Sequence, residues 1–444
     1  MVADVPLRAF AGHADHVPDA VPLIDLDVAP PRAPTRPGAL HRRLVPPRPV
    51  LVLGVLVLVL LGLAAAVPPA PAMVPVLSAG GTAAAAFALG PAALYTATFG
   101  QNPNSESGIR RYDLPAGTQV WATAVPQNVQ ALTVDAASGV LLARSGSDPR
   151  MTFLDAADGS ILWHLESAAT SAIALTNGKV LLRTDVGKTT ARLSVADART
   201  GAADWSRIMD NRSEVHDGPD RIVVIGADGH VTTLRFADGA LLGEGDLGVR
   251  LPVQQRDYAT ADAVVVSVVG DRIYVSRREQ GKTSTTAYGL PALTVDWRTT
   301  GGPVGAVYDC SPVLCISDTR WVSGLDRADG SVLWSDPAWS SAQVTPQGLV
   351  AYDQSENPEA AVIDPATGGV VRRLGHVVTL GEVGLRSDTT VPGRTWVGVT
   401  DRAGRPHTVG SLDTAAPYGC EARMPYLACP TTAGPTGVWR LPAP

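Results

Sequence analysis

The chain has 444 residues, of which 45% are hydrophobic and 18% charged, a composition that predicts a folded protein rather than a disordered one. Its 36 basic and 42 acidic residues give a net charge of −6, which argues against a nucleic-acid partner bound through a basic face. Glycine (44 residues) and proline (36 residues) are abundant, which favours a body rich in tight turns over a helical bundle.

The first 48 residues form an arm rich in proline and arginine, which is expected to be disordered. Within this arm, the segment VPLIDLD at residues 21–27 combines apolar and acidic side chains. It is either part of an unstructured leader or a short docking motif for a cytoplasmic partner.

Residues 49–67 are predicted to form a transmembrane helix. From residue 50 onward, 18 consecutive residues have neither a charge nor a hydrogen-bonding side chain. A helix of that length spans ~27 Å, close to the thickness of a bilayer core. A cleaved signal peptide, with the small residues 64–66 at its cleavage site, is the alternative.

The basic residues around this segment predict its orientation. Arg42, Arg43 and Arg48 precede it, and the next basic residue of the chain is Arg110. Positive charges remain on the cytoplasmic side, so we expect a single-pass protein of the cell membrane with its N-terminus inside and its larger part outside. A linker rich in proline and alanine is expected over residues 68–84.

The remainder of the chain repeats with a period of about 40 residues. The spacing Asp-x3-Gly-x3-Trp occurs four times, at Asp113/Gly117/Trp121, Asp155/Gly159/Trp163, Asp197/Gly201/Trp205 and Asp326/Gly330/Trp334. Weaker copies continue the phase at Arg235/Gly239, Gly289/Trp297, Asp364/Gly368, Asp401 and Arg440. The interval between Arg235 and Gly289 is longer than the others and predicts an insertion near residues 246–262.

Each copy is predicted to hold three strands and a turn. An apolar run such as VLLAR at 140–144 comes first, a second strand such as MTFLD at 151–155 ends on the Asp, and a third strand carries the Trp. Asp and Gly are assigned to the turn, because Asp accepts local backbone hydrogen bonds and Gly adopts positive φ without strain. The Trp is expected to pack one unit against the next.

These units predict an all-β fold, a β-propeller in which sheets stacked around an axis bury each other's faces. Eight blades of about 40–45 residues fit the propeller domain expected over residues 85–444, and seven blades are the alternative. The C-terminal stretch 426–442 resembles two strands of a further unit. It is expected to complete a blade together with strand material near residues 74–99, which would close the ring.

The clearest units, LDAADGSILW at 154–163 and LDRADGSVLW at 325–334, resemble the PQQ-like propeller repeat. That repeat is shared by quinoprotein alcohol dehydrogenases and by outer-membrane assembly propellers. The layout of arm, single span and propeller is similar to that of membrane-anchored PQQ-like propeller proteins of actinobacteria. The resemblance covers residues 85–444 and implies the fold, but it says little about activity, because one fold serves unrelated functions.

The four cysteines form two local pairs, Cys310/Cys315 and Cys420/Cys429, in the part expected outside the cell, where disulfides persist. A disulfide within each pair is favoured, because a turn can bring the two Cα atoms within ~6 Å. Each bond would contribute only ~1–2 kcal/mol, since the loop that it closes is short. Four buried free thiols are the alternative, and the spacing disfavours a zinc site.

No catalytic, cofactor-binding or metal-binding residues are predicted. The resemblance implies that a quinoprotein enzyme would have two adjacent cysteines over the quinone and a cluster of acidic and Asn ligands for calcium, and neither can be assigned. Five histidines are spread over different units and give no Ser-His-Asp order: His164, His216, His230, His376 and His407.

The sequence therefore predicts a non-enzymatic, membrane-anchored propeller without a cofactor. It would bind a protein, a glycan or a small molecule on a face of the ring, where loops usually carry recognition. The alternatives are a quinoprotein dehydrogenase dependent on PQQ and calcium, a scaffold for the assembly of secreted or envelope proteins, and a transducer that signals to the N-terminal arm.

Overall fold

The computed structural model describes residues 72–79, 84–98, 107–126, 128–145, 150–251, 263–318, 321–353, 355, 359–388, 390–401, 405–414 and 417–443. These residues belong to one compact unit, Pro69–Pro444. The predicted arm (1–48) and transmembrane helix (49–67) lie outside the described residues. Within the described part of the chain, no helix is both long enough and apolar enough to cross a membrane.

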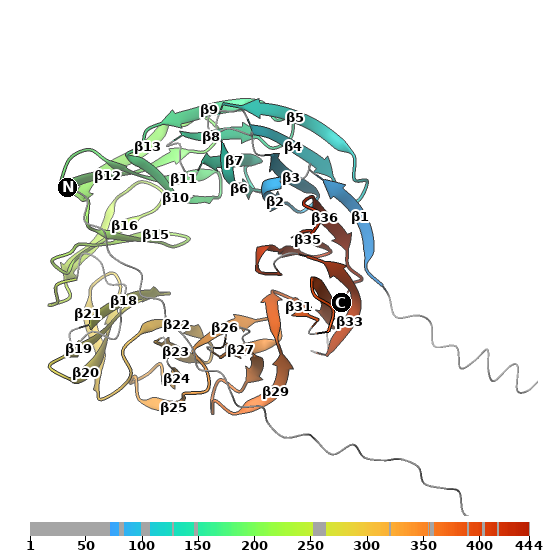
Figure 1. Ribbon diagram of the computed structural model, residues 1–444. Coiled ribbons are helices and arrows are strands. Elements are labelled where there is room, and N and C mark those ends of the chain that lie inside the picture. The colour runs from blue at the N-terminus through green and yellow to red at the C-terminus, as the bar shows by residue number, and fades with distance from the viewer. Residues whose placement is uncertain are drawn as a thin grey trace, which may run out of the picture. The chain divides into compact units, whose positions relative to one another are not determined.

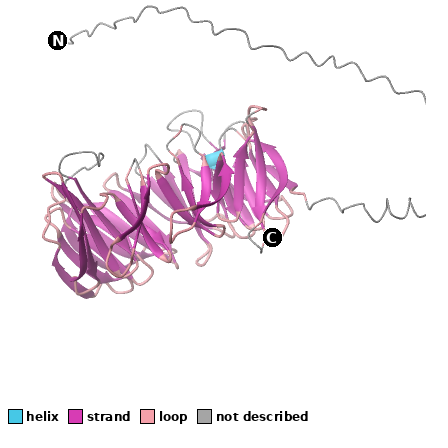
Figure 2. Cartoon of the chain, turned by 90° about the horizontal axis from the view of Figure 1, so that it is seen from below, coloured by secondary structure: helices cyan, strands magenta, loops and turns pink. Residues whose placement is uncertain are grey.

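The described residues form nine antiparallel sheets of four strands, which follow one another around a ring as the blades of a propeller (Figure 1). Strands make up nearly all of the regular structure, and the one helical element among the described residues is a short 3-10 turn, Pro417–Gly419 (Figure 2). The β-propeller predicted from the repeat is therefore confirmed.

The first four blades follow the chain in order. Blade one comprises β2 (Ala84–Leu89), β3 (Ala93–Thr98), β4 (Ser107–Asp113) and β5 (Gln119–Val125). Blade two comprises β6 (Val129–Asp135), β7 (Val140–Ser145), β8 (Arg150–Asp155) and β9 (Ile161–Glu166). Blade three comprises β10 (Thr170–Thr176), β11 (Lys179–Asp185), β12 (Thr190–Asp197) and β13 (Ala203–Asp210). Blade four comprises β14 (Glu214–Asp217), β15 (Arg221–Ile225), β16 (His230–Arg235) and β17 (Leu241–Asp246).

The next four blades repeat this order. Blade five comprises β18 (Ala263–Val269), β19 (Arg272–Glu279), β20 (Lys282–Gly289) and β21 (Thr294–Thr300). Blade six comprises β22 (Ala306–Cys310), β23 (Val313–Ser317), β24 (Val322–Leu325) and β25 (Val332–Asp336). Blade seven comprises β26 (Ser341–Thr345), β27 (Gly348–Tyr352), β28 (Ala360–Ile363) and β29 (Val370–Gly375). Blade eight comprises β30 (Val377–Leu380), β31 (Val383–Ser387), β32 (Arg394–Thr400) and β33 (Pro406–Asp413).

Blade nine combines the two ends of the described chain. Its strands are β34 (Glu421–Arg423), β35 (Tyr426–Pro430), β36 (Thr436–Arg440) and β1 (Val74–Ala79), and β1 pairs antiparallel with β36. The expectation that the C-terminal stretch completes a blade with N-terminal strand material is confirmed. Because β1 lies inside the stretch 68–84 that was expected to be a linker, the propeller begins before residue 85.

The expected count of eight or seven blades is wrong. The nine repeat marks named above, from Asp113 to Arg440, each stand at or directly after the end of the third strand of one blade. Dividing the length by 40–45 residues underestimated the number, because the later marks are only 37–39 residues apart and blade nine takes a strand from before residue 85. The long interval falls where predicted, between the end of β17 and the start of β18.

The three predicted strands of each unit are the second, third and fourth strands of a blade. The first strand, which lies nearest the centre of the ring, has no counterpart in the prediction (Figure 1). In blade three this strand reads TSAIALT. Small and polar residues interrupt its apolar pattern, so the sequence gives only a weak strand signal.

A cluster of buried apolar side chains lies at each of the nine seams between neighbouring blades. The seam between blades one and two buries 13 residues, including Ile109 and Leu141. The seam between blades seven and eight buries only Val350, Ala360 and Val362, all of them from blade seven. Apolar burial is the main favourable term in such packing, and this seam has the smallest buried apolar cluster of the nine among the described residues.

The ring has two different ends. Turns between the first and second strands, and between the third and fourth strands, lie at one end, which we call the turn end. Connections between the second and third strands, and between successive blades, lie at the other end, which we call the loop end. The alternation follows from the antiparallel order of the strands in each blade.

Candidate functional site

Each repeat Asp closes the turn that follows it in its own blade. In blade two, Asp155 Oδ1 accepts the Ala157 N–H at 2.7 Å, and the Asp155 carbonyl accepts the Gly159 N–H at 2.9 Å. Arg199 of blade three donates to Asp155 Oδ2 at 2.5 Å, and this bond, with the one from Ala157, lowers the pKa of Asp155. The same backbone bond occurs in the pairs Asp113/Gly117, Asp197/Gly201 and Asp326/Gly330.

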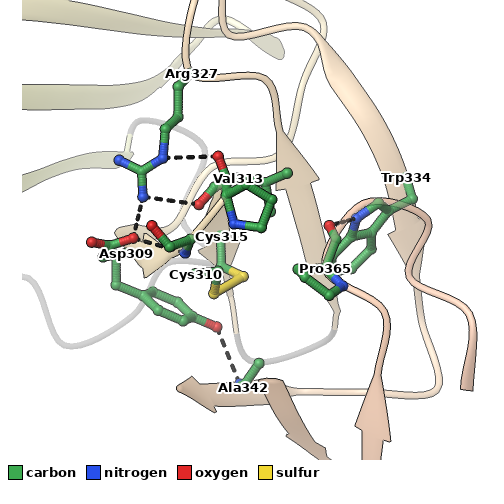
Figure 3. The surroundings of a disulfide bond; sticks show 11 residues. Asp309, Cys310, Val313, Cys315, Arg327, Trp334, Ala342 and Pro365 are labelled. Carbon is green, nitrogen blue, oxygen red and sulfur yellow. Dashed lines mark hydrogen bonds and ion pairs between the residues drawn. A yellow bond between two sulfur atoms is a disulfide. The ribbon is translucent and has the colours of Figure 1, made fainter. Parts of the chain in front are cut away.

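Each repeat Trp contacts the turn of the following blade. Trp163 on β9 donates its indole N–H to the carbonyl of Ala198 at 2.9 Å, and Ala198 directly follows the repeat residue Asp197. Four other tryptophans make the equivalent bond: Trp121 to Ala156, Trp205 to Phe236, Trp297 to Arg327 and Trp334 to Pro365, the last of which is drawn in Figure 3.

The repeat Gly lies against the indole ring of the preceding blade. A Cβ on Gly201 would come within 2.8 Å of Trp163, and Gly201 has a φ of 69°, which an L side chain adopts only with strain. The same approach occurs at Gly159, Gly239, Gly330 and Gly368. We call the indole bond and the glycine approach together the Trp–turn contact. It joins five pairs of blades, so the repeat spacing is a device for joining blades.

Gly117 of blade one is an exception, and the predicted packing through a Trp needs correction there. Gly117 lies in the turn as predicted, with a φ of 68°, and its N–H donates to the carbonyl of Asp113 at 2.8 Å. No indole ring lies against it. A Cβ on Gly117 would instead meet the carbonyl oxygen of Val76 at 2.9 Å. The reason is the closure of the ring, because the preceding blade is blade nine and its fourth strand, β1, contains no Trp.

At the seam between blades four and five, the small residue stands on the strand and the large residue stands in the turn, the reverse of the Trp–turn contact. Gly243 stands at the Trp position of β17, and Leu293, with a φ of 53°, stands at the Gly position of the next turn. A Cβ on Gly243 would lie only 2.2 Å from the carbonyl oxygen of Pro291. The small residue has moved to the strand, so the turn approaches the strand backbone directly.

The seam between blades seven and eight has no Trp–turn contact. Arg372 on β29 stands at the Trp position, because it pairs with Val362 as Trp163 pairs with Phe153 in blade two. The turn of blade eight is also shorter, with the Asp401 N–H donating to the carbonyl of Arg405, four residues on. The missing contact leaves this seam open.

A groove follows this open seam along β29 and the facing side of blade eight. Toward the turn end it holds a hollow of about 220 Å³, and toward the loop end a second hollow of about 360 Å³. Leu374, Arg386 and Trp396 line both hollows. We call the two hollows together the seam groove.

Two glycines form the floor of the first hollow. Gly384 on β31 and Gly398 on β32 are directly paired across the two strands. A Cβ at either position would meet its nearest neighbour at 3.4 Å or 3.6 Å, which is ordinary contact distance. Val397 and Val399, which flank Gly398 along β32, pack into the apolar cluster toward blade nine. Blade eight therefore has a filled face toward blade nine and a hollowed face toward blade seven.

The walls of the first hollow are basic. Arg372, Arg373 and Arg386 line it, and no Asp or Glu is among its described lining residues. Arg373 forms an ion pair with Glu359 at 3.2 Å, whereas Arg386 is exposed and pairs with no acidic group within the described part of the chain. In a protein of net charge −6, Arg386 gives this hollow a positive group that no described carboxylate pairs with.

Trp396 is held at the middle of the groove by its neighbours. Its indole N–H donates to Asp388 Oδ2 at 3.1 Å, and the Arg394 guanidinium lies 5.9 Å from the ring centroid. Arg386 is paired with Trp396 across the strands. Hydrogen bonds from Thr390, and those from Val391 and Trp396, lower the pKa of Asp388 to about 2. This carboxylate stays charged at ordinary pH and fixes the indole.

A buried hydroxyl of the groove lacks a partner. Thr400 on β32 is 6% exposed and lines the first hollow, two residues along the strand from Gly398. Its Oγ1 has no hydrogen-bond partner among the described residues. Because an unpaired buried polar group costs free energy, this hydroxyl is a site at which a ligand atom would be favourable.

A larger hollow, of about 720 Å³, lies beside the tip of the β19–β20 hairpin in blade five. Its walls include Arg277, Lys282 and Arg298, and Arg277 is 3.6 Å from Glu279. No lining side chain in this hollow is a described buried group without a hydrogen bond. The seam groove therefore gives the more specific evidence for a ligand site.

Both predicted disulfides are present. Cys310–Cys315 joins β22 to β23 with Cα atoms 5.5 Å apart, and Cys420–Cys429 joins the start of β34 to β35 with Cα atoms 4.2 Å apart. Figure 3 shows Cys310–Cys315 beneath Arg327, which bonds to Asp309 and to the Val313 carbonyl. Each disulfide connects the first two strands of its own blade.

The described residues do not fit the cofactor set of a quinoprotein enzyme. No group of three or more His, Cys, Asp or Glu side chains among them is arranged to hold a metal ion, and all four cysteines are used in the two disulfides. His376 and His407 line different hollows of the seam groove, and His407 Nε2 lies 2.9 Å from Asp401 Oδ2. The other three histidines named above are not among its lining residues.

The seam groove has no counterpart among the predicted sites. The sequence does carry a sign of the groove, because the repeat copies that begin at Asp364 and Asp401 have no Trp eight residues after the Asp. As weak copies of the repeat, they gave no reason to expect a site. The cross-strand pairing of Gly384 with Gly398 depends on strand register, and register is not visible in the repeat itself.

The comparison with family models agrees with the fold. The family model described as "Outer membrane protein assembly factor BamB" matches residues 105–336. No curated protein sequence matches the chain significantly. Among solved structures, BamB from Moraxella catarrhalis is 15% identical, with a TM-score of 0.42 over 80% of this chain and 93% of that one. The computationally designed Ika8 protein is 13% identical, with a TM-score of 0.45 over 83% of this chain and 100% of that one.

The dihydro-heme d1 dehydrogenase NirN is 12% identical, with a TM-score of 0.43 over 66% of each chain. These three structural likenesses are too distant to assign a function. The family match is different in kind, because it covers more than half of the sequence and spans blades that carry the Trp–turn contact. The chain belongs to the PQQ-like β-propeller repeat family whose model is described as outer membrane protein assembly factor BamB.

Proposed function

We propose that the protein is a non-enzymatic, membrane-anchored binding module whose propeller holds a ligand outside the membrane, in the seam groove between blades seven and eight. The observation that carries this proposal is the open seam itself. Five seams are joined by the same Trp–turn contact, whereas this seam has Arg372 at the Trp position and two glycines in the facing blade.

An open seam has a cost for the fold. The seam between blades seven and eight buries three apolar residues, far fewer than the 13 between blades one and two. Departures from the local rules of a fold are expected at functional sites. The groove also contains basic side chains and an unpaired buried hydroxyl, which are features of a ligand site.

A protein is the ligand class that the family description favours, because the matching family is described as an assembly factor for outer membrane proteins. The role of an assembly scaffold for secreted or envelope proteins is a specific form of the same proposal. A dehydrogenase dependent on PQQ and calcium has no support in the described side chains, and the experiment below includes it as an outcome.

The proposal is tested with a photo-crosslinking amino acid in the full chain, in its native membrane. Position 408, an exposed threonine that lines the first hollow, places the probe in the groove, and position 192, an exposed arginine on β12 of blade three, is the control. We expect a discrete adduct from position 408 that disappears when Gly398→Val fills the hollow. The proposal fails if both positions give the same adducts, or if neither gives any.

Two further readouts address the anchor and the enzyme alternative. The full chain should remain in the membrane after carbonate washing, and protease added outside intact cells should digest the propeller. Adding PQQ and calcium should neither shift the melting temperature nor start the reduction of a dye. Dye reduction would contradict the proposal of a binding module and support the dehydrogenase alternative.

A further inference from the structure

The chemistry of the seam groove narrows the class of ligand, and this step rests on the function proposed above. We infer that the groove takes an extended peptide segment in which acidic and apolar side chains alternate. Charge, apolar lining, the unpaired hydroxyl and the direction of the groove each contribute to this assignment.

The groove runs along part of the strand β29. Its lining residues on β29 extend from Arg372 to Gly375, and those on β32 extend from Trp396 to Thr400. Four residues of a strand, from 372 to 375, span ~13 Å. The groove therefore matches a short extended segment better than a compact small molecule.

Part of the first hollow is apolar, and its floor is formed by glycines, which have no side chain. Leu374, Val377 and Pro406 line it above the paired glycines 384 and 398. An aliphatic side chain of the ligand would fill this space and bury apolar surface on both partners. A sugar ring would bring hydroxyl groups to the same place, and those without a partner would be costly to bury.

The basic groups select an acidic partner. Arg372 and Arg386 lie on opposite walls of the groove, one from each blade. Guanidinium groups bind carboxylates through paired hydrogen bonds. In an extended peptide, successive side chains point to opposite sides, so a segment with an apolar residue toward the floor presents its acidic neighbours toward the walls and rim.

Thr400 supplies the remaining polar contact. Its hydroxyl is buried, lines the hollow and has no hydrogen-bond partner among the described residues. An extended peptide has a carbonyl group at every residue, and such a carbonyl would accept this hydroxyl hydrogen. The ligand would thereby satisfy a group that the fold leaves unpaired.

The test uses the full chain in detergent and a fluorescent six-residue peptide of alternating leucine and aspartate. Binding is measured by fluorescence anisotropy. One control peptide has asparagine in place of each aspartate, and another has serine in place of each leucine. An oligogalacturonate supplies carboxylates on a glycan. We expect the first peptide to bind at least tenfold more tightly than either control peptide, and the glycan to compete weakly.

Three substitutions locate the binding. Arg386→Ala should weaken binding by about tenfold, since it removes a charge-assisted contact, whereas the control Arg192→Ala should leave it unchanged. Thr400→Val should weaken binding while raising the melting temperature, because it removes a buried unpaired hydroxyl. A groove that was merely structural would not give these opposite signs. Gly398→Val should abolish binding in a protein that melts like the wild type.

The outcomes separate this inference from the proposed function. If the neutral peptide binds as tightly as the acidic one, or if the glycan binds and the peptides do not, the assigned ligand class is wrong. The crosslink from position 408 would still support a binding module. If peptide binding is unchanged by Arg386→Ala, Thr400→Val and Gly398→Val, the peptide site is not the seam groove and the inference is overturned.

Discussion

Gly201 of blade three lies directly beneath the indole ring of Trp163 of blade two, so closely that a Cβ on residue 201 would come within 2.8 Å of the ring. The same indole donates its N–H to Ala198 of the same turn, at 2.9 Å. The Asp-x3-Gly-x3-Trp spacing is thereby explained. Asp and Gly form the turn against which the Trp of the preceding blade packs. The Trp of the same copy packs in turn against the following blade.

Replacing Gly201 by Ala should destabilise the fold strongly. The new Cβ adds a positive-φ cost of about 1–2 kcal/mol and a clash with Trp163 worth about 1–3 kcal/mol more. Gly270→Ala is the matched control, because Gly270 has a similar φ of 60° and a Cβ there would meet nothing within 4 Å. Urea unfolding of the full chain measures both variants.

The comparison depends on the difference between the two glycines. We expect Gly270→Ala to lower the free energy of unfolding only by the cost of the positive φ. Equal losses for Gly201→Ala and Gly270→Ala would show that the approach of the indole contributes nothing, and the Trp–turn contact would then be an incidental feature of the repeat.

The exchanged seam between blades four and five makes a second prediction. Gly243→Ala should cost more than about 2 kcal/mol, because its Cβ would meet the Pro291 carbonyl oxygen at 2.2 Å and backbone cannot move aside easily. Gly398→Ala, where the nearest atom would be 3.6 Å away, should change the stability by less than about 1 kcal/mol. A tolerated Gly243→Ala, seen as an unchanged unfolding midpoint, would contradict the packing described here.

Most of the fold was predictable from the repeat, because a turn with Asp and Gly and a strand with Trp leave local signals. The count of blades was not, since it depends on the ring closing through β1 and β36, which are far apart in the chain. The same closure sets Gly117 against the backbone of β1 instead of an indole. In blade three the first strand, β10, was missed for a local reason, as its small and polar residues break the apolar pattern. The groove could not be predicted, because it needs the register that pairs Gly384 with Gly398.

The two disulfides should contribute modestly. Replacing Cys310 and Cys315 by Ala removes a cross-link over five residues and should lower the free energy of unfolding by about 2 kcal/mol through loop closure. The pair Cys420/Cys429, with a separation of nine residues, should give a similar loss. Chemical unfolding under oxidising conditions measures both. An unchanged unfolding midpoint in either variant would show that its disulfide adds nothing to stability.

Asp388 should make the stability of the protein depend on acid. Its folded-state pKa of about 2 lies below the ordinary value of 3.8, so its contribution is complete above pH 3.8 and is lost as the pH falls toward about 2. Asp388→Asn removes this titration. The difference in stability between the wild type and Asp388→Asn should therefore shrink across that window in urea unfolding series. A constant difference would mean that the Thr390 and Trp396 bonds do not hold the carboxylate charged.

The claim that blades seven and eight were left open to hold a ligand is tested most directly by closing their seam. Arg372→Trp places an indole at the position that Trp163 occupies in blade two, and Arg372→Lys keeps the charge as the control. The measurement is the photo-crosslinked adduct from position 408 in the native membrane, with the melting temperature recorded for each variant. We predict that the Trp variant melts no lower than the wild type and gives no adduct, while the Lys variant retains it. A folded Trp variant that still forms the adduct in full would contradict this claim.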